Sequence, residues 1–256
     1  MQLFLEDGSY LLINEGIDCS IPLTASEENP TAWYVAAPSI DVVRENGWVG
    51  SVKEGGSVNF RNIHFNPHGH GTHTECLGHI TPTVFSVNGL VKKLFYQAYV
   101  VSVEPTLIEN ADGQMDSVIT AAALAGVLDG IKAEAILIRT LPNETNKLTK
   151  HYSATNPAYC STDILPILEN MGVRHLLIDT PSVDRESDGG VLAFHHAFWG
   201  VPTDLQHDKT ITELIFVPNE VKDGAYLLNL QTAAFENDAT PSRPIIYPIH
   251  RNEEEQ

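Results

Sequence analysis

The chain has 256 residues and a formal net charge of −18, from 15 basic and 33 acidic residues. Such an excess of negative charge repels phosphate backbones and anionic lipids, so it argues against nucleic-acid and membrane partners. The sequence contains no apolar run of membrane-spanning length, no secretory signal pattern, and only three scattered cysteines. We therefore expect a single domain over residues 1–256 that works in the cytoplasm. Three glutamates at 253–255 are expected to form a solvated end.

The amino-terminal segment predicts a β-hairpin. Apolar residues at Leu3–Leu5 and Tyr10–Ile13 flank Asp7-Gly8, a dipeptide typical of two-residue turns. The following stretch, Thr24–Gly56, is rich in Ser, Pro, Glu and Gly, which predicts a long irregular connection.

Two tryptophans in that connection, Trp33 and Trp48, have two possible roles. Either could pack on a substrate as part of a cap over the pocket, or both could anchor the connection to the core. The sequence leaves both interpretations open.

Histidines are concentrated in one short stretch. Residues 64–79 contain five of the eleven histidines, with glycines at 69 and 71 that let the backbone turn sharply. His73 and Glu75 share one face if this part is extended. Imidazole and carboxylate groups are suitable ligands for zinc or manganese. We interpret the stretch as a divalent-metal site, with zinc first and manganese as the alternative, rather than as a surface loop with adventitious metal affinity.

Strand and helix patterns alternate after the histidine cluster. The predicted elements are a strand over Ala98–Glu104, a helix over Asp116–Leu128, a strand over Ala135–Ile138, a helix over Ser161–Met171 and a strand over His175–Ile178. This order favours an α/β domain with parallel crossovers.

Three later residues are further candidates for the site. Glu213 lies in the middle of a predicted apolar strand, Ile211–Val217. A buried, unpaired carboxylate would cost several kcal/mol, so Glu213 is either exposed on an edge or neutralised by a cation. The adjacent pair His195 and His196 lies in an apolar segment, where each could also be a core or helix-face histidine.

The run Gly71-Thr72-His73-x-Glu75, followed by His79, resembles the signature of a known family. That family is the cyclase family of metal-dependent hydrolases, which includes bacterial kynurenine formamidase and isatin hydrolase. Further segments that match the family pattern are Gly16–Pro22, Asp179–Asp184, Leu192–Trp199 and Gly224–Pro244. The resemblance thus extends over nearly the whole chain.

The sequence departs from the family signature His-x-Gly-Thr-His-x-Asp-x-Pro-x-His at three positions. Glu75 replaces the aspartate, Leu77 replaces the proline, and Gly69 occupies the first histidine position. His68 and His70 flank Gly69, and either could supply the missing ligand. We favour His68, because the proline before it sets the chain direction and a one-residue bulge would re-aim it.

The resemblance implies a swivelling β/β/α fold, in which a barrel-like mixed sheet carries outer helices, and a homo-oligomer of two or more copies. It also implies a set of metal ligands and an acid/base group. The implied ligands are His68 or His70, His73, Glu75, His195 and Glu213, with His195 preferred to His196, and His79 is the implied general acid/base.

The implied activity is hydrolysis of an amide-type carbon–nitrogen bond in a small formamide or cyclic amide, with water activated by the metal. Glu75 is one methylene longer than aspartate, a difference that is large against the ~0.2 Å tolerance of metal–ligand distances, so the substrate is not carried over. The alternative is a catalytically silent metal- or small-molecule-binding protein on the same scaffold. The presence of His79 favours the enzyme.

Overall fold

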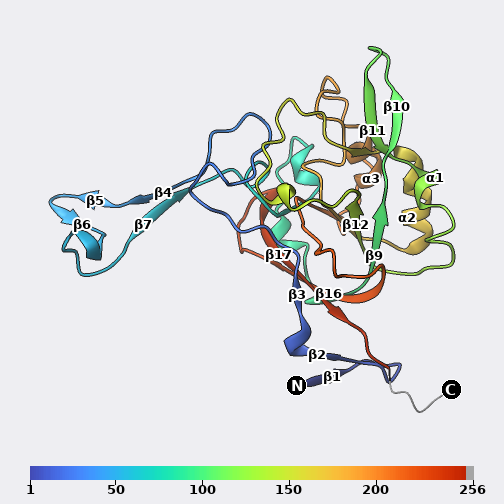
Figure 1. Cartoon of the computed structure of the whole chain (residues 1–256), viewed down its shortest axis with the longest axis horizontal. Coiled ribbons are helices and arrows are strands. Elements are labelled where there is room, and N and C mark those ends of the chain that lie inside the picture. Colours follow the sequence, from blue (N-terminus) through green and yellow to red (C-terminus); the bar gives the residue numbers. More distant parts are fainter. Residues whose placement is uncertain (252–256) are drawn as a thin grey trace.

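The computed structural model describes residues 1–251, and the glutamates at 253–255 lie outside the described residues (Figure 1). Its centre is a mixed sheet of seven strands that closes on itself, because β16 pairs with both β9 and β17. The strand order is β16 (Gly224–Thr232), β9 (Phe95–Val103), β12 (Ala135–Thr140), β14 (His175–Ile178), β15 (Thr210–Glu213), β8 (His73–Glu75) and β17 (Ala239–Pro248). A short strand, β3 (Ile17–Asp18), pairs with β17 on its other side.

One half of the barrel is parallel. Strands β9, β12, β14 and β15 run in one direction, whereas β8 is antiparallel to both of its neighbours. The α-helices are α1 (Ala121–Leu124), α2 (Leu165–Met171) and α3 (Ala193–Trp199), and α1 and α2 lie beside β9 and β12 in Figure 1. The expected α/β fold with a barrel-like mixed sheet and outer helices is therefore confirmed.

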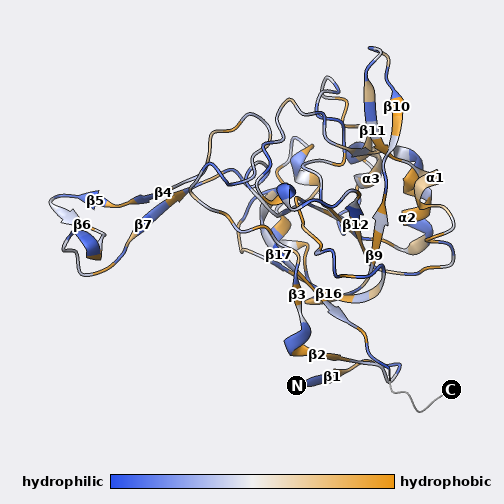
Figure 2. Ribbon diagram, in the orientation of Figure 1, coloured by the Kyte–Doolittle hydropathy of each residue, from blue (hydrophilic) through white to orange (hydrophobic). Residues whose placement is uncertain are grey.

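The core has two main layers because side chains alternate across each strand. On β12, Ile136 and Ile138 join the larger cluster with residues of α1, α2 and α3, whereas Ala135 and Leu137 join the cluster formed with β16 and β17. Figure 2 shows hydrophobic residues along β9 and the neighbouring helices. Both faces of the central strands are thus buried, which matches their nearly continuous apolar sequences.

Most predicted elements are present. The amino-terminal hairpin is formed by β1 (Gln2–Phe4) and β2 (Tyr10–Leu12), and the predicted strands after the cluster are β9, β12 and β14. The second predicted helix is observed as a 3-10 turn, Thr162–Ile164, that leads into α2. The late strand ends at Glu213 rather than at Val217, because Leu214 adopts a left-handed conformation with φ of 53°.

The helix predicted over Asp116–Leu128 is wrong in its first half. Met115–Ile119 form strand β11, which pairs with β10 (Thr106–Glu109) and β13 (Tyr159–Cys160). Asp116 is not an exposed acid at a helix start; it is buried and accepts hydrogen bonds from Asn110, Asn156 and Tyr159. These long-range contacts override the local helix preference, and α1 retains only four residues.

The predicted irregular connection is partly ordered into a projecting arm, defined here as residues 39–64. It contains β4 (Ser39–Val42) paired with β7 (Arg61–His64), and β5 (Arg44–Glu45) paired with β6 (Trp48–Val49). The arm extends away from the body of the molecule (Figure 1).

The 3-10 helices are Ile13–Glu15, Val52–Glu54, Leu77–His79, Val87–Gly89, Thr145–Leu148 and Thr162–Ile164. Among residues 1–251, none of the helices has the length and apolar character needed to cross a membrane.

The two tryptophans of the connection lie in different places. Trp33 is partly buried and packs against a small core cluster that includes Tyr152 and Leu214, as expected for an anchor. Trp48 lies on the arm, where its ring contacts Phe60 edge-on at 5.7 Å between centroids. The contacts of Trp33 match the anchoring role, and Trp48 belongs to the arm.

The central position of β12 predicts a specific stability effect. Ile136 is fully buried, so Ile136→Ala should lower the free energy of unfolding by about 2–5 kcal/mol through lost burial and a residual cavity. Urea denaturation followed by circular dichroism measures this change. The control is Ile108→Ala on β10, where the side chain is 42% exposed, with an expected change within about 0.5 kcal/mol. Equal effects of the two substitutions would contradict the assignment of this core.

Candidate metal centre

Strand β8 carries the first two candidate ligands into the interior. His73 and Glu75 are 0% and 1% exposed and, as residues i and i+2, lie on one face of the strand. Glu213 on β15 pairs directly with His73, and the atoms His73 Nε2 and Glu213 Oε2 lie 3.4 Å apart. Leu214, directly after Glu213, has a left-handed backbone conformation. Its N–H donates a hydrogen bond to the carbonyl of residue 180, and its carbonyl accepts one from the hydroxyl of residue 72. Barrel closure therefore brings these three side chains together.

A tight turn before β8 presents His68. The Gly69 carbonyl accepts a hydrogen bond from Ala32 N–H, and His68 Nδ1 lies 3.0 Å from Glu75 Oε2. A Cβ added at Gly69 would lie only 2.7 Å from Val35 Cγ2 and 3.2 Å from the Ala32 carbonyl oxygen, so a side chain here would require its neighbours to shift. The position where the family signature has its first histidine is thus a closely packed glycine, and the preceding residue, His68, faces Glu75.

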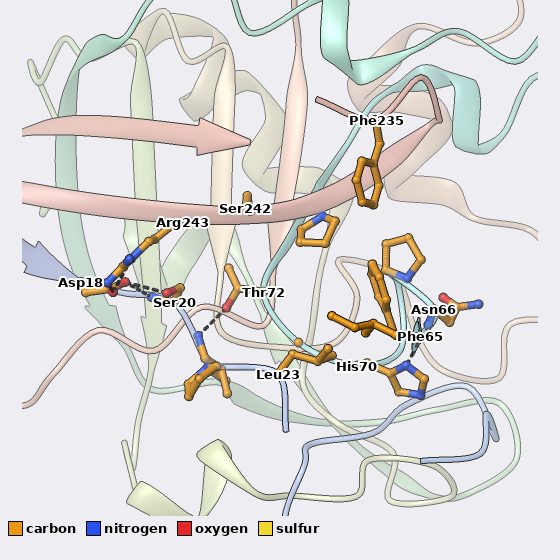
Figure 3. A pocket seen from close by; sticks show the side chains of 16 residues that line it. Asp18, Ser20, Leu23, Phe65, Asn66, His70, Thr72, Phe235, Ser242 and Arg243 are labelled. Atoms are coloured by element: carbon orange, nitrogen blue, oxygen red, sulfur yellow. Dashed lines mark hydrogen bonds and ion pairs between the residues drawn. The ribbon is translucent and has the colours of Figure 1, made fainter. Parts of the chain in front are cut away.

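His70, the other residue that flanks Gly69, points elsewhere. Its Nδ1 accepts a hydrogen bond from Asn66 N–H at 2.8 Å, and its Nε2 therefore donates to the Ala36 carbonyl at 2.7 Å. Figure 3 shows His70 at the edge of a pocket of about 590 Å³ whose lining includes Phe65 and Phe235. Both ring nitrogens of His70 are engaged, so the structure brings His68 and not His70 to Glu75.

Helix α3 places His195 on the opposite side of Glu75. His195 Nε2 lies 3.0 Å from Glu75 Oε1 and 3.9 Å from Glu213 Oε1. Its Nδ1 donates to Asp184 Oδ2 at 2.6 Å, and Asp184 also accepts the backbone N–H groups of residues 194 and 195 at the start of the helix. His196, by contrast, faces the end of its own helix, where Nδ1 lies 3.4 Å from the carbonyl of residue 201.

His79 lies at the solvent side of the cluster. It ends the 3-10 helix after β8, and its side chain is 32% exposed, whereas that of Glu75 is 1% exposed. His79 Nε2 is 3.9 Å from Glu75 Oε2, and Nδ1 is 3.3 Å from Asp238 Oδ2. This mixture of solvent access and proximity to Glu75 suits a group that exchanges protons with a substrate.

Two carboxylates at the site were not singled out from the sequence. Asp184 contacts His195, and Asp238 contacts both His68 and His79. Asp184 ends the segment that resembles the family's Asp-Thr-Pro-Ser-x-Asp run, which could have marked it. Asp238 directly precedes β17 and has no local pattern that distinguishes it from other acids of this chain.

The arrangement fits a divalent cation. Two groups of side chains have potential ligand atoms within 4.8 Å of one another: His68, Glu75 and His79, and His73, Glu75 and Glu213. His73 Nε2 and Glu75 Oε2 are buried and make no well-aligned hydrogen bond among residues 1–251, although His68 Nδ1 lies 3.0 Å from that oxygen and buried polar atoms are normally paired. A cation between these groups would give both orphaned atoms a partner, and Glu75 belongs to both groups.

The pKa values of the clustered side chains also fit a cation site. Burial lowers the pKa of His68 and of His195, but the adjoining carboxylates outweigh burial and raise the pKa of each to about 10. Burial raises the pKa of Glu75, yet the surrounding imidazoles hold it well below its usual range. Protonated imidazoles thus balance the buried carboxylates when no cation does, and metal binding would displace those protons.

Comparison with known proteins agrees with this geometry. A family model described as "Putative cyclase" matches residues 17–185. Kynurenine formamidase of Bacillus cytotoxicus is 31% identical over 77% of this chain and 84% of that protein. Kynurenine formamidase of Bacillus thuringiensis subsp. konkukian is 31% identical over 92% of this chain and 99% of that protein.

The fold also has solved counterparts. The crystal structure of an isatin hydrolase bound to the product analogue thioisatinate superposes with a TM-score of 0.64 at 14% identity, over 91% of this chain and 92% of that one. Since the family model covers more than half of the residues and the curated relatives align over most of their length, this chain belongs to the cyclase family of metal-dependent hydrolases.

Proposed function

We propose that this protein is a metal-dependent hydrolase that cleaves an amide-type carbon–nitrogen bond in a small formamide or cyclic amide. The observation that carries the proposal is the buried Glu75 carboxylate, which lies between two groups of candidate ligands and has an unpartnered oxygen. The names of the relatives, kynurenine formamidase and isatin hydrolase, support this bond type. Glu75 and Leu77 differ from the family signature, so the individual substrate is left open.

The ligand set that we propose has five residues: it adds His195 to the two groups and leaves out His79, which we assign to acid/base catalysis. His68, His73, Glu75, His195 and Glu213 would hold one ion, or two ions on either side of Glu75, with zinc as the first candidate and manganese as the second. His70 is left out of this set because its ring nitrogens are bound to backbone groups.

We assign separate roles in hydrolysis to His79 and Asp184. A divalent ion at the site would polarise the substrate carbonyl and make water a nucleophile near neutral pH. His79, at the solvent side of the cluster, would accept the proton of the attacking water and return it to the departing nitrogen. Asp184 keeps His195 in one orientation through its hydrogen bond to Nδ1.

A substrate screen tests the proposal. Protein reconstituted with zinc or manganese should hydrolyse at least one member of a panel of aryl formamides, cyclic amides and lactones, and chelation should abolish the activity because the ion activates both water and carbonyl. Product release followed by absorbance or chromatography measures turnover. A protein that binds metal but turns over no member of the panel would instead support a silent binding protein.

The variant His79→Ala tests whether His79 acts as the acid/base rather than as a metal ligand. We expect the variant to keep its bound metal, measured by atomic emission after purification without a histidine tag, but to lose about 10²–10⁴-fold in kcat. The comparison variant is His73→Ala, which removes a buried candidate ligand and should lose metal as well as activity. Unchanged turnover in His79→Ala would remove this residue from the chemistry.

We further propose that the protein is a homo-oligomer, with at least two copies joined through the arm. The arm exposes five large apolar side chains: Trp48, Val52, Val58, Phe60 and Ile63. It carries three acidic and three basic residues, so it is neutral in a chain of net charge −18. A two-stranded ribbon is marginally stable alone, and a second copy would cover its apolar residues without a large charge repulsion.

For localisation we propose the cytoplasm, since all three cysteines are free and buried.

A charge placed on the arm tests this interface. Wild-type protein should sediment as a dimer or larger species in analytical ultracentrifugation, and Phe60→Asp should shift it toward the monomer because a carboxylate would be buried against the partner. Val127→Asp, at a similarly exposed apolar residue outside the arm, should leave the sedimentation unchanged. A monomeric wild-type protein would contradict the proposal.

A further inference from the structure

Two imidazoles of the site share one carboxylate oxygen. Asp238 Oδ2 lies 3.0 Å from His68 Nε2 and 3.3 Å from His79 Nδ1. The two rings are stacked, with centroids 4.2 Å apart and planes inclined by 28°. Their other nitrogens approach Glu75 Oε2, at 3.0 Å for His68 Nδ1 and 3.9 Å for His79 Nε2. The pair of rings therefore lies between two carboxylates, with Glu75 on the buried side and Asp238 on the side nearer solvent.

The position of Asp238 is fixed by the sheet. Its carbonyl accepts a hydrogen bond from Cys76 N–H at 3.0 Å, and the next residue, Ala239, begins β17 opposite Glu75. Asp238 is thus held beside β8 by the same backbone ladder that holds Glu75. The carboxylate comes from a rigid part of the barrel, so it can set the orientation of groups carried by the less regular segments that bear His68 and His79.

With a divalent ion bound beside Glu75, hydrogen bonds to Asp238 would assign opposite tasks to the two nitrogens of each ring. A ring nitrogen that donates to a carboxylate must carry the hydrogen, which leaves the other nitrogen with its lone pair in the neutral imidazole. For both rings the nitrogen left with a lone pair is the one that approaches Glu75. Both rings are thereby prepared for their proposed tasks, His68 as a ligand and His79 as a proton acceptor.

We propose that Asp238 is a shared positioning residue, which holds a candidate metal ligand, His68, and the candidate acid/base, His79, in the tautomer and orientation that the hydrolase needs. This inference rests on the proposed function. It differs from the role of Asp184, which contacts one imidazole only. Asp238 acts through the two histidines, and its oxygens are in neither group of candidate ligand atoms.

Removing the carboxylate should affect both histidines. In Asp238→Ala, we expect zinc affinity, measured by competition with a chromophoric chelator, to fall about 10–100-fold, and kcat for the substrate found in the screen to fall by a similar factor. Asp238→Asn keeps the shape and one acceptor oxygen, so its losses should be smaller, and it also covers the case in which the alanine variant does not fold. Asp223→Ala, which removes a carboxylate that pairs with Arg139 outside the site, should leave zinc affinity unchanged.

Double variants distinguish positioning from a general structural effect. If Asp238 acts through His79, Asp238→Ala should change kcat by less than about twofold when His79 is already alanine. If it acts through His68, it should change zinc affinity by less than about twofold in a His68→Ala background. Full additivity in both backgrounds, or single variants within about twofold of wild type, would overturn the inference.

The zinc measurement keeps this inference separable from the proposed function. A wild-type chain that binds zinc but hydrolyses nothing in the screen contradicts the hydrolase, while the affinity cycle with His68 still decides whether Asp238 positions that residue. Loss of one whole equivalent of zinc in Asp238→Asn would identify Asp238 as a ligand and overturn the positioning role. A wild-type chain that binds no zinc would overturn both proposals.

Discussion

Compensation of the buried charge on Glu75 is the constraint on which the rest of the site depends. The carboxylate lies on the shortest strand of the closed barrel, 1% exposed, where an isolated charge would be strongly unfavourable. Every candidate site residue except His70 and His196 lies around it: imidazoles approach it from the preceding turn, the following 3-10 helix and α3, and Glu213 extends from the neighbouring strand. The fold therefore concentrates negative charge in its interior and requires either protons or a cation to balance it.

Several features of the fold and the site could be predicted from the sequence because they follow from local patterns. The strands β12 and β14 contain continuous apolar runs, and such runs identify strands that are buried on both faces. Glu213 was predicted to lie exposed on an edge or to be neutralised by a cation, and it is 3% exposed beside His73. The i, i+2 spacing of His73 and Glu75 likewise predicted a shared face.

Other features depend on contacts between distant segments, and local patterns could not predict them. Asp116 looked like an acid at a helix start, but partners 6 to 43 residues away hold it in a strand. The alternative between His68 and His70 is decided by contacts that the sequence does not reveal: His70 Nε2 is bound to the Ala36 carbonyl, 34 residues away, whereas His68 Nδ1 lies beside Glu75. Asp238 reaches the site only because β17 pairs with β8, more than 150 residues earlier in the chain.

Gly69 also bears on how the family can diverge. A histidine introduced at this position would place its Cβ 2.7 Å from Val35 Cγ2, so Val35 would have to shift to admit it. The imidazole has moved by one position along the backbone while remaining beside the same carboxylate. Consensus design that introduced a histidine at position 69 would therefore not supply a missing imidazole, because His68 already lies beside Glu75.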